Sequence, residues 1–400
     1  MDTGEMLGGL YKKTTYLEQY RKKQGNIIVV DSGDLLNEYI EIKESIQSSA
    51  RLKADLIAQI YQSIGIDAIN VGELDLALGL YYLKLLEKTY DIPFVSANLV
   101  DETNTPIFKP YIIKEINGRK IGIFGLMGDS SDMVAKLKEV SGGKISVTEL
   151  IPSAESMVNE LKGKVDIIIA MTHNQMGQNW VVARKIPGID LIVGGHHKQK
   201  IKTPYKADNT YIVQSGEKGQ YQGMLELTFA PDGTRSAENE LVPLGPAIPD
   251  DPRVKAMIDQ YNNKVTSLYA LARQEDVEVS LNARACETCH SEEFSIWQAS
   301  DHARAFETLV KISRQFNPDC LTCHTTRFEQ EGGFTMELQQ PELINVQCDS
   351  CHGNSARHLK DGEPMPEQKL DMASCVKCHT PDRCPDFEKN YQEEWQKIKH

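Results

Sequence analysis

The sequence predicts two domains of different fold class, an α/β layered domain over residues 1–246 and a mainly α domain over residues 285–400. In the first part, short apolar runs alternate with amphipathic stretches, and strands that alternate with helices indicate a layered α/β fold. In the second part, the pattern Cys-x-x-Cys-His occurs four times. A stretch rich in proline and aspartate separates the two parts, and residues 247–284 are expected to form a helical linker.

The first domain is expected to begin with a helix and then to alternate strands with helices. Apolar runs that end at polar turn residues indicate buried strands, and apolar residues at helical spacing indicate amphipathic helices. The expected helices lie at 10–23, 45–64 and 75–89. The expected strands lie at 26–30, 67–71, 93–96, 120–126, 165–171 and 190–193.

Polar residues follow four of these strands. Asp34, Glu73, His173 and His196 each come directly after, or soon after, an apolar run. In open α/β sheets, ligands bind beyond the carboxyl ends of the strands. The sequence therefore predicts that these four side chains share one pocket.

The first 245 residues resemble the metallophosphoesterase domain of the 5'-nucleotidase family. The resemblance runs through Gly8-Gly-Leu10, Asp31-Ser-Gly-Asp34, Thr172-His173 and Gly194-Gly-His196. It implies a layered αββα fold in which Asp, His and Asn hold two metal ions that activate water against a phosphoester. It also implies that Asp34, Glu73, His173 and His196 form a residual metal site for a divalent ion such as Mn, Zn or Fe.

Departures from the family pattern fall on the catalytic chemistry. No Asp-x-His pair precedes Gly8, so the first strand of the domain is expected to be missing. The family's Gly-Asn-His-Glu appears as Gly72-Glu-Leu-Asp75, which puts Glu73 at a metal-ligand position and Leu74 at the catalytic histidine position. The second histidine of Gly-His-x-His is Lys198, which is expected to place a positive charge where a metal would sit. We therefore expect an inactive phosphoesterase domain. Its remaining histidines are then either metal ligands or former ligands that hydrogen bond in a polar pocket.

The linker is expected to begin with a helix. Asp251 and Pro252 are typical of a helix start, with the aspartate as cap and the proline in the first turn. This helix is expected to reach about Arg273 and to be followed by a polar segment over residues 274–284.

The four Cys-x-x-Cys-His motifs have the spacing of covalent haem attachment, in which two cysteine sulfurs take up the vinyl groups and the histidine binds the iron. A zinc ribbon would also pair cysteines in this way, but it needs no histidine after each pair. We therefore expect four covalently bound c-type haems. The attaching cysteines are Cys286, Cys289, Cys320, Cys323, Cys348, Cys351, Cys375 and Cys378, and the proximal ligands are His290, His324, His352 and His379.

The haem domain has about thirty residues for each haem, too few for an ordinary side-chain core. The macrocycles are therefore expected to form the core, with short helices and loops around them. The chain has ten histidines, and the three that are neither proximal nor in the first domain all lie in this segment. These three, His302, His358 and His400, are expected to be distal ligands, which leaves one haem without a histidine partner.

Residues 286–400 resemble the cytochrome c-554 family of tetrahaem cytochromes. The resemblance covers all four motifs together with Trp297-Gln-Ala-Ser-Asp-His302 and Trp395 to His400. It implies three bis-histidine haems, with His290 paired with His358, His352 with His302, and His379 with His400. His324 then holds a five-coordinate haem that can bind a small ligand such as nitric oxide. The alternatives are that a methionine, a lysine or a first-domain histidine fills that position.

One cysteine, Cys384, is left over from the motifs. We expect an ordinary free thiol there, with a thiolate ligand or a redox thiol as alternatives. The formal charge of −13 and the lack of a basic stripe argue against nucleic-acid binding, and no run of about 20 apolar residues predicts a membrane span. Because covalent haem is attached outside the cytoplasm, the protein is expected to be exported to the periplasm or the cell surface. Residues 1–5 show no signal sequence, so we expect the signal to lie outside this chain.

The leading functional interpretation is a multihaem c-type cytochrome that transfers electrons between partner proteins, a donor and an acceptor, outside the cytoplasm. The first domain would then be a scaffold, a docking surface or a ligand-binding module. One alternative is a bifunctional protein with a working metal-dependent phosphoesterase, which Asp34, His173 and His196 favour and Leu74 and Lys198 oppose. A second is an oxidoreductase that acts on a small nitrogen compound at the open haem. A purely structural role would require haems that undergo no redox change.

Overall fold

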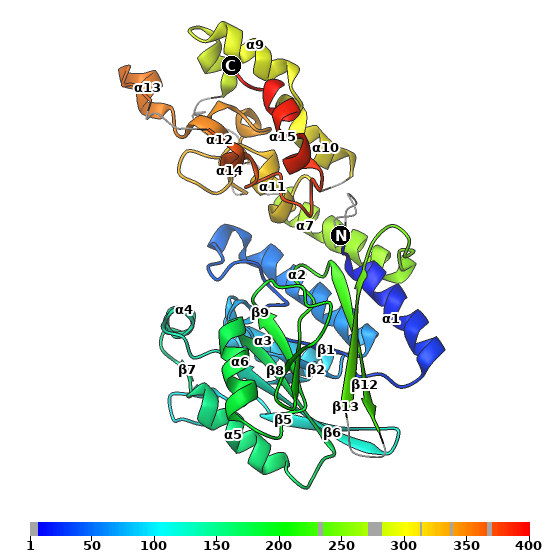
Figure 1. Ribbon diagram of the computed structural model, residues 1–400. Helices are drawn as coiled ribbons and strands as arrows, with labels where there is room; N and C mark the ends of the chain where they lie inside the picture. The colour runs from blue at the N-terminus through cyan, green and yellow to red at the C-terminus, as the bar shows by residue number, and fades with distance from the viewer. Residues whose placement is uncertain (1–6, 231–234, 271–281, 313, 337–338, 366–369) are drawn as a thin grey trace. The chain divides into compact units, whose positions relative to one another are not determined.

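The computed structural model describes residues 7–230, 235–270, 282–312, 314–336, 339–365 and 370–400 (Figure 1). Its contacts divide the chain into two compact units. One consists of Leu7–Ile42 and Lys53–Lys255, and we call it the sheet unit. The other contains Lys43–Leu52 and Ala256–His400, and we call it the helical unit.

The sheet unit contains two main β-sheets. The larger has the strand order β10-β11-β9-β8-β6-β5, with parallel pairing from β6 through β8 and β9 to β11. Its strands are β5 (Tyr111–Ile116), β6 (Arg119–Met127), β8 (Ile167–Asn174), β9 (Leu191–His196), β10 (Tyr205–Ala207) and β11 (Thr210–Val213). The smaller sheet is parallel throughout and consists of β1 (Val30–Asp31), β2 (Ala68–Asn70) and β3 (Phe94–Val95). Two antiparallel pairs complete the unit, β4 (Leu99–Asp101) with β7 (Ile145–Val147) and β12 (Tyr221–Phe229) with β13 (Arg235–Pro243).

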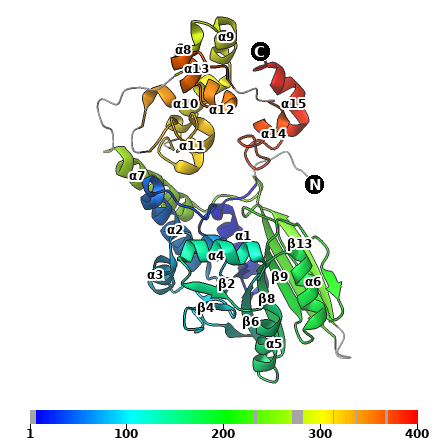
Figure 2. The ribbon, with the colours of Figure 1, turned by 90° about the vertical axis from the view of Figure 1, so that its left-hand side faces the viewer.

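Apolar packing on both faces of the larger sheet produces the layers. One face packs against α5 (Leu150–Leu161) and α6 (Met176–Lys185) through a buried cluster that includes Phe124 and Ile192. The opposite face packs against residues of β2, β3, β12 and β13. Figure 2 shows α2 (Glu44–Ile64) and α3 (Leu80–Tyr90) on the side of the sheets away from α6. The layered α/β architecture predicted from the sequence is therefore confirmed. The remaining helices of this unit are α1 (Leu10–Gln24), η1 (Leu74–Leu76) and α4 (Ser131–Ser141).

The predicted elements differ from the observed ones mainly at their ends. The helix expected at 75–89 is divided, because η1 ends before Gly79, whose φ of 86° is left-handed backbone that glycine adopts readily. The strand expected at 26–30 pairs only at Val30–Asp31. Strand β8 is longer than expected, and it carries His173 and Asn174 inside the sheet.

The helical unit is built from short helices and loops. Within its described residues we find no strand, only an isolated bridge between Thr325 and Ile344. This confirms a mainly α fold. The helices are α7 (Pro252–Ala270), α8 (Ala283–Glu287), α9 (Ser291–Ala299), η2 (Asp301–Arg304), α10 (Ala305–Lys311), α11 (Pro318–His324), η3 (Pro341–Leu343), α12 (Cys348–His352), α13 (Ala356–Asp361), α14 (Met372–Cys375) and α15 (Phe387–Gln396).

Helix α7 begins where the sequence predicts, at Pro252, with Asp251 accepting hydrogen bonds from Arg253 and Val254 N–H groups. Most of the predicted polar segment over residues 274–284 lies outside the described residues. None of the described helices combines the length and the apolar composition needed to cross a bilayer.

Candidate metal centre and haem-binding residues

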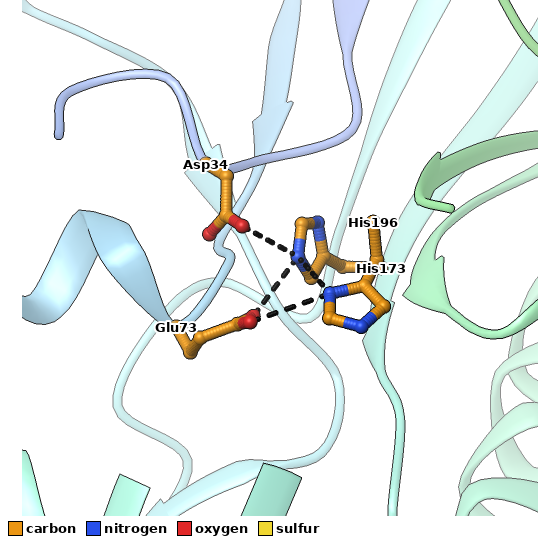
Figure 3. Close-up of side chains that lie close together, drawn as sticks. All are labelled: Asp34, Glu73, His173 and His196. Atoms are coloured by element: carbon orange, nitrogen blue, oxygen red, sulfur yellow. Dashed lines mark hydrogen bonds and ion pairs between the residues drawn. The ribbon is translucent and has the colours of Figure 1, made fainter. Parts of the chain in front are cut away.

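Four side chains converge where strands of both sheets end (Figure 3). Asp34 follows β1, Glu73 follows β2, and His173 and His196 lie at the ends of β8 and β9. One potential ligand atom from each residue lies within 4.8 Å of those of the other three. The structure therefore brings together the four residues that the sequence places in one pocket.

The hydrogen bond of the His173 ring determines which nitrogen faces the cluster. Nδ1 of His173 lies 2.8 Å from the carbonyl oxygen of Ser32, and it must carry a proton to donate to that acceptor. In the neutral ring, Nε2 then has a lone pair, and it lies 3.1 Å from Asp34 Oδ2 and 2.9 Å from Glu73 Oε2. Three electron-rich atoms at these distances require a cation between them, either a proton or a metal ion.

Glu73 provides a second indication of a cation. The residue is 3% exposed, and as long as His173 is neutral no donor hydrogen bonds to its buried Oε2. Its other oxygen lies 3.3 Å from His196 Nδ1, which is also 3.3 Å from His173 Nε2. A buried carboxylate oxygen without a partner is costly, and a bound metal ion removes that cost. Two carboxylates and two imidazoles suit ions such as Mn, Fe and Zn, so the donor set fits a metal.

Protonation of the cluster follows from the same contacts. Burial alone would lower the pKa of His173, but the hydrogen bonds and charges of Asp34 and Glu73 outweigh burial and raise that pKa well above its ordinary value. Burial alone would raise the pKa of Glu73, whereas hydrogen bonds to the two histidines lower it below the usual range. Without a metal, His173 therefore carries the compensating proton, which a bound metal ion would displace.

Asp75 holds the two acidic loops together, a role that the sequence analysis missed. Its buried carboxylate accepts hydrogen bonds of 2.8 to 3.0 Å from four backbone N–H groups, those of Asp34, Leu35, Leu36 and Gly72. Burial and the charge of Asp34 raise the pKa of Asp75 to about 7. The only signal in the sequence was a carboxylate two positions after Glu73.

The ligand loops also hold unfavourable backbone conformations. Asp34 has φ of 58° and His196 has φ of 62°, in the left-handed region that non-glycine residues adopt at a cost of order 1 kcal/mol or more. A Cβ atom at Gly72 would lie 2.3 Å from Asp34 Oδ1, so glycine is needed for this close approach. Packing around the site therefore holds the four side chains in place at a cost in stability.

Two of the departures from the phosphoesterase pattern, at Leu74 and Lys198, differ in where their side chains lie. Leu74 is half-buried beside the cluster, and its backbone N–H donates to Asp34 Oδ1 over 2.8 Å. Lys198 points away, because its Nζ pairs with Glu217 Oε2 at 2.8 Å and its side chain is 70% exposed. The expectation that Lys198 places its charge at the metal position is therefore wrong. The acidic partner Glu217, nineteen residues later in the chain, draws the side chain outward.

Each of the four Cys-x-x-Cys-His motifs forms a short helix or a helical turn. The second and third motifs lie in α11 and α12, and in the first and fourth the histidine N–H bonds to the first cysteine carbonyl, over 2.9 and 3.0 Å. None of the nine cysteines, all of which lie in the described residues, forms a disulfide, and Cys384 is half-buried. In the haem-loaded protein, the eight motif thiols would become thioether sulfurs.

Six histidine rings of the helical unit meet as three pairs. His290 lies against His358, His302 against His379, and His352 against His400, with ring centres 6.3, 6.0 and 5.5 Å apart. A metal–imidazole bond of about 2 Å, plus about 1 Å from nitrogen to ring centre, puts two axial imidazole centres about 6 Å apart. The pairs therefore have the spacing needed to hold one iron between two rings.

The ring contacts agree with the pairing expected from the resemblance for one pair of histidines and differ from it for two. His290 does lie against His358, but His302 contacts His379 rather than His352, and His400 contacts His352. Helix α15 explains the difference. It begins with Phe387 stacked on His379 at 4.2 Å, and its ten residues carry the chain about 15 Å from there. The terminal His400 lies four residues beyond the end of this helix and contacts His352 instead.

Backbone carbonyls orient three of these imidazoles through Nδ1. This leaves Nε2 free for iron, and a carbonyl acceptor makes the ligand more basic. The hydrogen bonds join His324 to Ala305, His358 to Glu363 and His400 to Ile398, over 2.7, 2.7 and 3.0 Å.

His324 stands apart from the other motif histidines. All ten histidines lie in the described part of the chain, and none of the other nine forms a ring contact with His324. Of the remaining rings, those of His173 and His196 contact each other, and His197 is exposed. This matches the count from the sequence, in which one haem has no second histidine.

Comparisons with known proteins find different relatives for the two parts of the chain. The family model described as cytochrome c554 and c-prime matches residues 285–353. The cytochrome c-554 of Nitrosomonas europaea is 29% identical over 134 residues, covering 27% of this chain and 57% of its own length. In the other part, the protein UshA of Yersinia enterocolitica is 27% identical over 277 residues, covering 61% of this chain.

Solved structures confirm the fold of the sheet unit. The 5'-nucleotidase precursor of Thermus thermophilus aligns with a TM-score of 0.53 at 23% identity, over 66% of this chain and 54% of that one. The match to UshA spans 49% of that protein's length, so this chain accounts for about half of such a relative. These findings show a 5'-nucleotidase or calcineurin-like phosphoesterase region that is followed by a C-terminal cytochrome c554 domain. Cytochromes c554 are c-type haem proteins.

Proposed function

We propose that this protein is a tetrahaem c-type cytochrome that transfers electrons between partner proteins outside the cytoplasm. The three histidine pairs, at 5.5 to 6.3 Å, carry this proposal. Two imidazoles on one iron keep it six-coordinate in both oxidation states, so little rearrangement accompanies the gain or loss of an electron. The cytochrome domain implies redox partners, and the expected covalent haem attachment supports a location outside the cytoplasm.

Contacts between motif sulfurs support a continuous path through the four haems. The thiol of Cys286 hydrogen bonds to that of Cys348, and the thiol of Cys323 to that of Cys378. Cys351 and Cys375 are close enough to interact electrostatically. Because each sulfur would carry a haem edge, the haems of motifs one and three, three and four, and four and two would be neighbours. Electrons would then pass from the haem of the first motif to those of the third, the fourth and the second motif in turn, or in the reverse direction.

The test of this function is a spectroscopic and redox titration of the haem-loaded protein. We expect four haems per chain by pyridine haemochrome, three low-spin signals and one high-spin signal in the ferric protein, and uptake of four electrons by the haems. Haems that stay oxidised in the presence of a strong reductant and mediators would contradict the proposal.

The haem at His324 is the site for a small ligand. Its imidazole has a fixed Nδ1 hydrogen bond, to Ala305, and none of the other nine histidine rings lies opposite it. We expect nitric oxide to bind the reduced protein at one haem per chain. If all four ferric haems are low-spin, a methionine, lysine or other side chain fills that position, and the oxidoreductase alternative for a nitrogen compound fails.

For the sheet unit, we propose metal binding without phosphoester hydrolysis. The donor atoms of Asp34, Glu73, His173 and His196 support binding of a divalent ion. Leu74 can neither transfer a proton nor stabilise a phosphate at the position beside Asp34. We expect no turnover of 5'-nucleotides with manganese or zinc supplied. Metal-dependent turnover that is lost in Asp34→Ala would establish the bifunctional alternative instead.

A further inference from the structure

The segment that follows the second Cys-x-x-Cys-His motif is fixed by backbone contacts. Thr325 forms an antiparallel bridge with Ile344, and the N–H group of Thr326 donates to the carbonyl of Leu343 over 2.9 Å. Both threonines are buried. Because His324 immediately precedes this pair, the chain leaves the haem-binding histidine in one fixed direction.

Arg327 comes next, and its backbone is held in an unfavourable conformation. Its φ of 49° is left-handed, which a non-glycine residue adopts only when the surrounding structure requires it. Its carbonyl accepts a hydrogen bond from the N–H group of Gln330 over 3.0 Å. A Cβ atom at Gly333 would collide with that carbonyl oxygen, so glycine is needed for the loop to fold back this closely. The loop therefore fixes the point from which the Arg327 side chain extends.

The guanidinium group of Arg327 has a buried nitrogen without an acceptor. Nη1 forms no hydrogen bond, and among the described residues no acidic side chain forms an ion pair with Arg327. The nearest acidic residue in the sequence, Glu329, is engaged elsewhere. Its Oε1 accepts from the N–H group of Met336 over 2.9 Å, and its Oε2 accepts from Ser45 Oγ over 3.0 Å. A buried donor of a charged group is costly to leave unpaired, so this position favours an anion.

A haem propionate is the anion that the second motif itself would bring to this position. Arg327 lies three residues after His324, so the Cα atoms of the two residues are at most about 11 Å apart. The His324 ring is oriented by its Nδ1 contact with the carbonyl of Ala305, at 2.7 Å. The direction from this ring to its iron is therefore fixed relative to the loop. A guanidinium group suits a carboxylate, because it can donate two parallel hydrogen bonds to it.

We propose that Arg327 binds a propionate of the haem attached at Cys320 and Cys323 and thereby raises the reduction potential of that haem. This inference rests on the proposed cytochrome function, which supplies the haem. The guanidinium and the propionate form an ion pair in a partly buried environment, where charges interact more strongly than in water. Without the arginine, the propionate would leave an uncompensated negative charge beside the haem, and the haem would be harder to reduce.

The test is a redox titration of the full-length, haem-loaded protein that is followed by EPR. The high-spin ferric signal reports the haem of His324, because the other three haems are expected to be low-spin. Arg327→Gln should shift the midpoint potential of this haem to lower values. Arg327→Lys should recover part of the shift, because lysine restores the charge but cannot donate two parallel hydrogen bonds.

Lys311→Gln is the matched control. It removes the same charge from an exposed side chain of α10, where water and salt screen that charge. The potential of the high-spin haem should therefore stay unchanged in this variant. Equal shifts in Lys311→Gln and Arg327→Gln would show a general effect of net charge and would overturn the proposal.

Nitrite distinguishes the propionate from an external anion of similar chemistry. If Arg327 binds an external oxyanion instead, Arg327→Gln should weaken nitrite binding to the ferric high-spin haem by about tenfold or more. The potential measured without nitrite would then be the same as in the unmodified protein, and the proposal would be overturned. We expect the opposite result, a lowered potential with nearly unchanged nitrite binding.

The remaining outcomes separate this inference from the proposed function. Four reducible haems with an unchanged high-spin potential in Arg327→Gln would overturn the inference and leave the cytochrome function intact. If Arg327→Gln does not retain four haems, Arg327→Lys decides, because propionate binding still predicts a lowered potential and an unchanged one contradicts it. Haems of the unmodified protein that cannot be reduced would contradict the proposed function and, with it, this inference.

Discussion

The sheet unit and the helical unit are stabilised in different ways. The sheet unit buries apolar side chains on both faces of a six-stranded sheet, and Phe124, Leu126 and Ile123 are all fully buried. From residue 282 onward, the described part of the chain buries few hydrophobic side chains, namely Ala283, Phe294, Leu309, Leu321, Phe334, Met336 and Leu343. The first unit therefore has a core made of protein, whereas the second needs its cofactors to complete one.

The strongest test of this contrast is removal of the haems. When the chain is produced in a host that does not attach haem, we expect the helical unit to lose most of its protection in amide hydrogen exchange. Strands β6, β8 and β9 should remain protected, because their hydrogen bonds and apolar contacts need no cofactor. Protection of α9, α11 and α12 without haem would mean that the second unit has a sufficient core of its own.

The reverse test removes apolar volume from the sheet unit. Phe124→Ala should lower the free energy of unfolding of that unit by about 3–5 kcal/mol, because the ring is fully buried between sheet and helices. Tyr81→Ala, at a side chain that is 83% exposed, is the control and should change stability by less than about 0.5 kcal/mol. Fluorescence-detected unfolding measures both. A parallel loss of the haem Soret band in Phe124→Ala would show that the two units do not fold independently.

The two units also differ in how far the sequence predicts them. The layers of the sheet unit followed from apolar runs, and its pocket followed from the rule that ligands lie at the carboxyl ends of strands. Asp75 was missed because its four N–H partners come from two loops that only the fold brings together. Lys198 was misplaced because its partner Glu217 lies in a different segment, and no local pattern shows that contact.

In the helical unit, the motifs predict the proximal ligands, and counting the remaining histidines predicts the distal ones. The count does not show which two imidazole rings would bind the same iron, because that depends on the direction in which short helices leave each motif. Phe387, stacked on His379, shows that α15 starts at the fourth motif, and the helix length then takes His400 to the third. The pairings therefore needed the three-dimensional path of the chain.

A double variant tests the pairing directly. If His302 and His379 share one iron, His302→Ala/His379→Ala should leave two low-spin haems of the original three, because only one pair is damaged. If His302 instead paired with His352, the same double variant would damage two haems and leave one. Low-temperature EPR of the ferric protein counts the signals. The single variant His302→Ala should convert one low-spin haem to high-spin.

Metal binding should stabilise only the sheet unit. A ligand that binds the folded state stabilises it by about 2.7 kcal/mol when present at a hundredfold excess over its Kd. Adding zinc or manganese should therefore raise the melting temperature of the sheet unit and leave the haem spectrum unchanged. Asp34→Asn should abolish the shift. Equal stabilisation of that variant would mean that the ion binds outside the cluster of Asp34, Glu73, His173 and His196.

The smallest expected effect concerns the orientation of one haem ligand. Phe387 stacks on His379 with ring centres 4.2 Å apart and planes 12° apart, and Tyr391 follows it on the same face of α15. A stacked ring pair contributes about 0.5–1.5 kcal/mol, enough to favour one rotation of the imidazole about its bond to iron. Phe387→Leu should therefore shift the EPR g values of a single low-spin haem, while Tyr391→Leu, which contacts no histidine ring, should shift none. Haem content should stay at four in both. If neither variant shifts the g values, the plane of the His379 ring is set by the haem and by the opposing His302. Side-chain packing in the helical unit would then contribute as little to the geometry of its haem ligands as it does to its core.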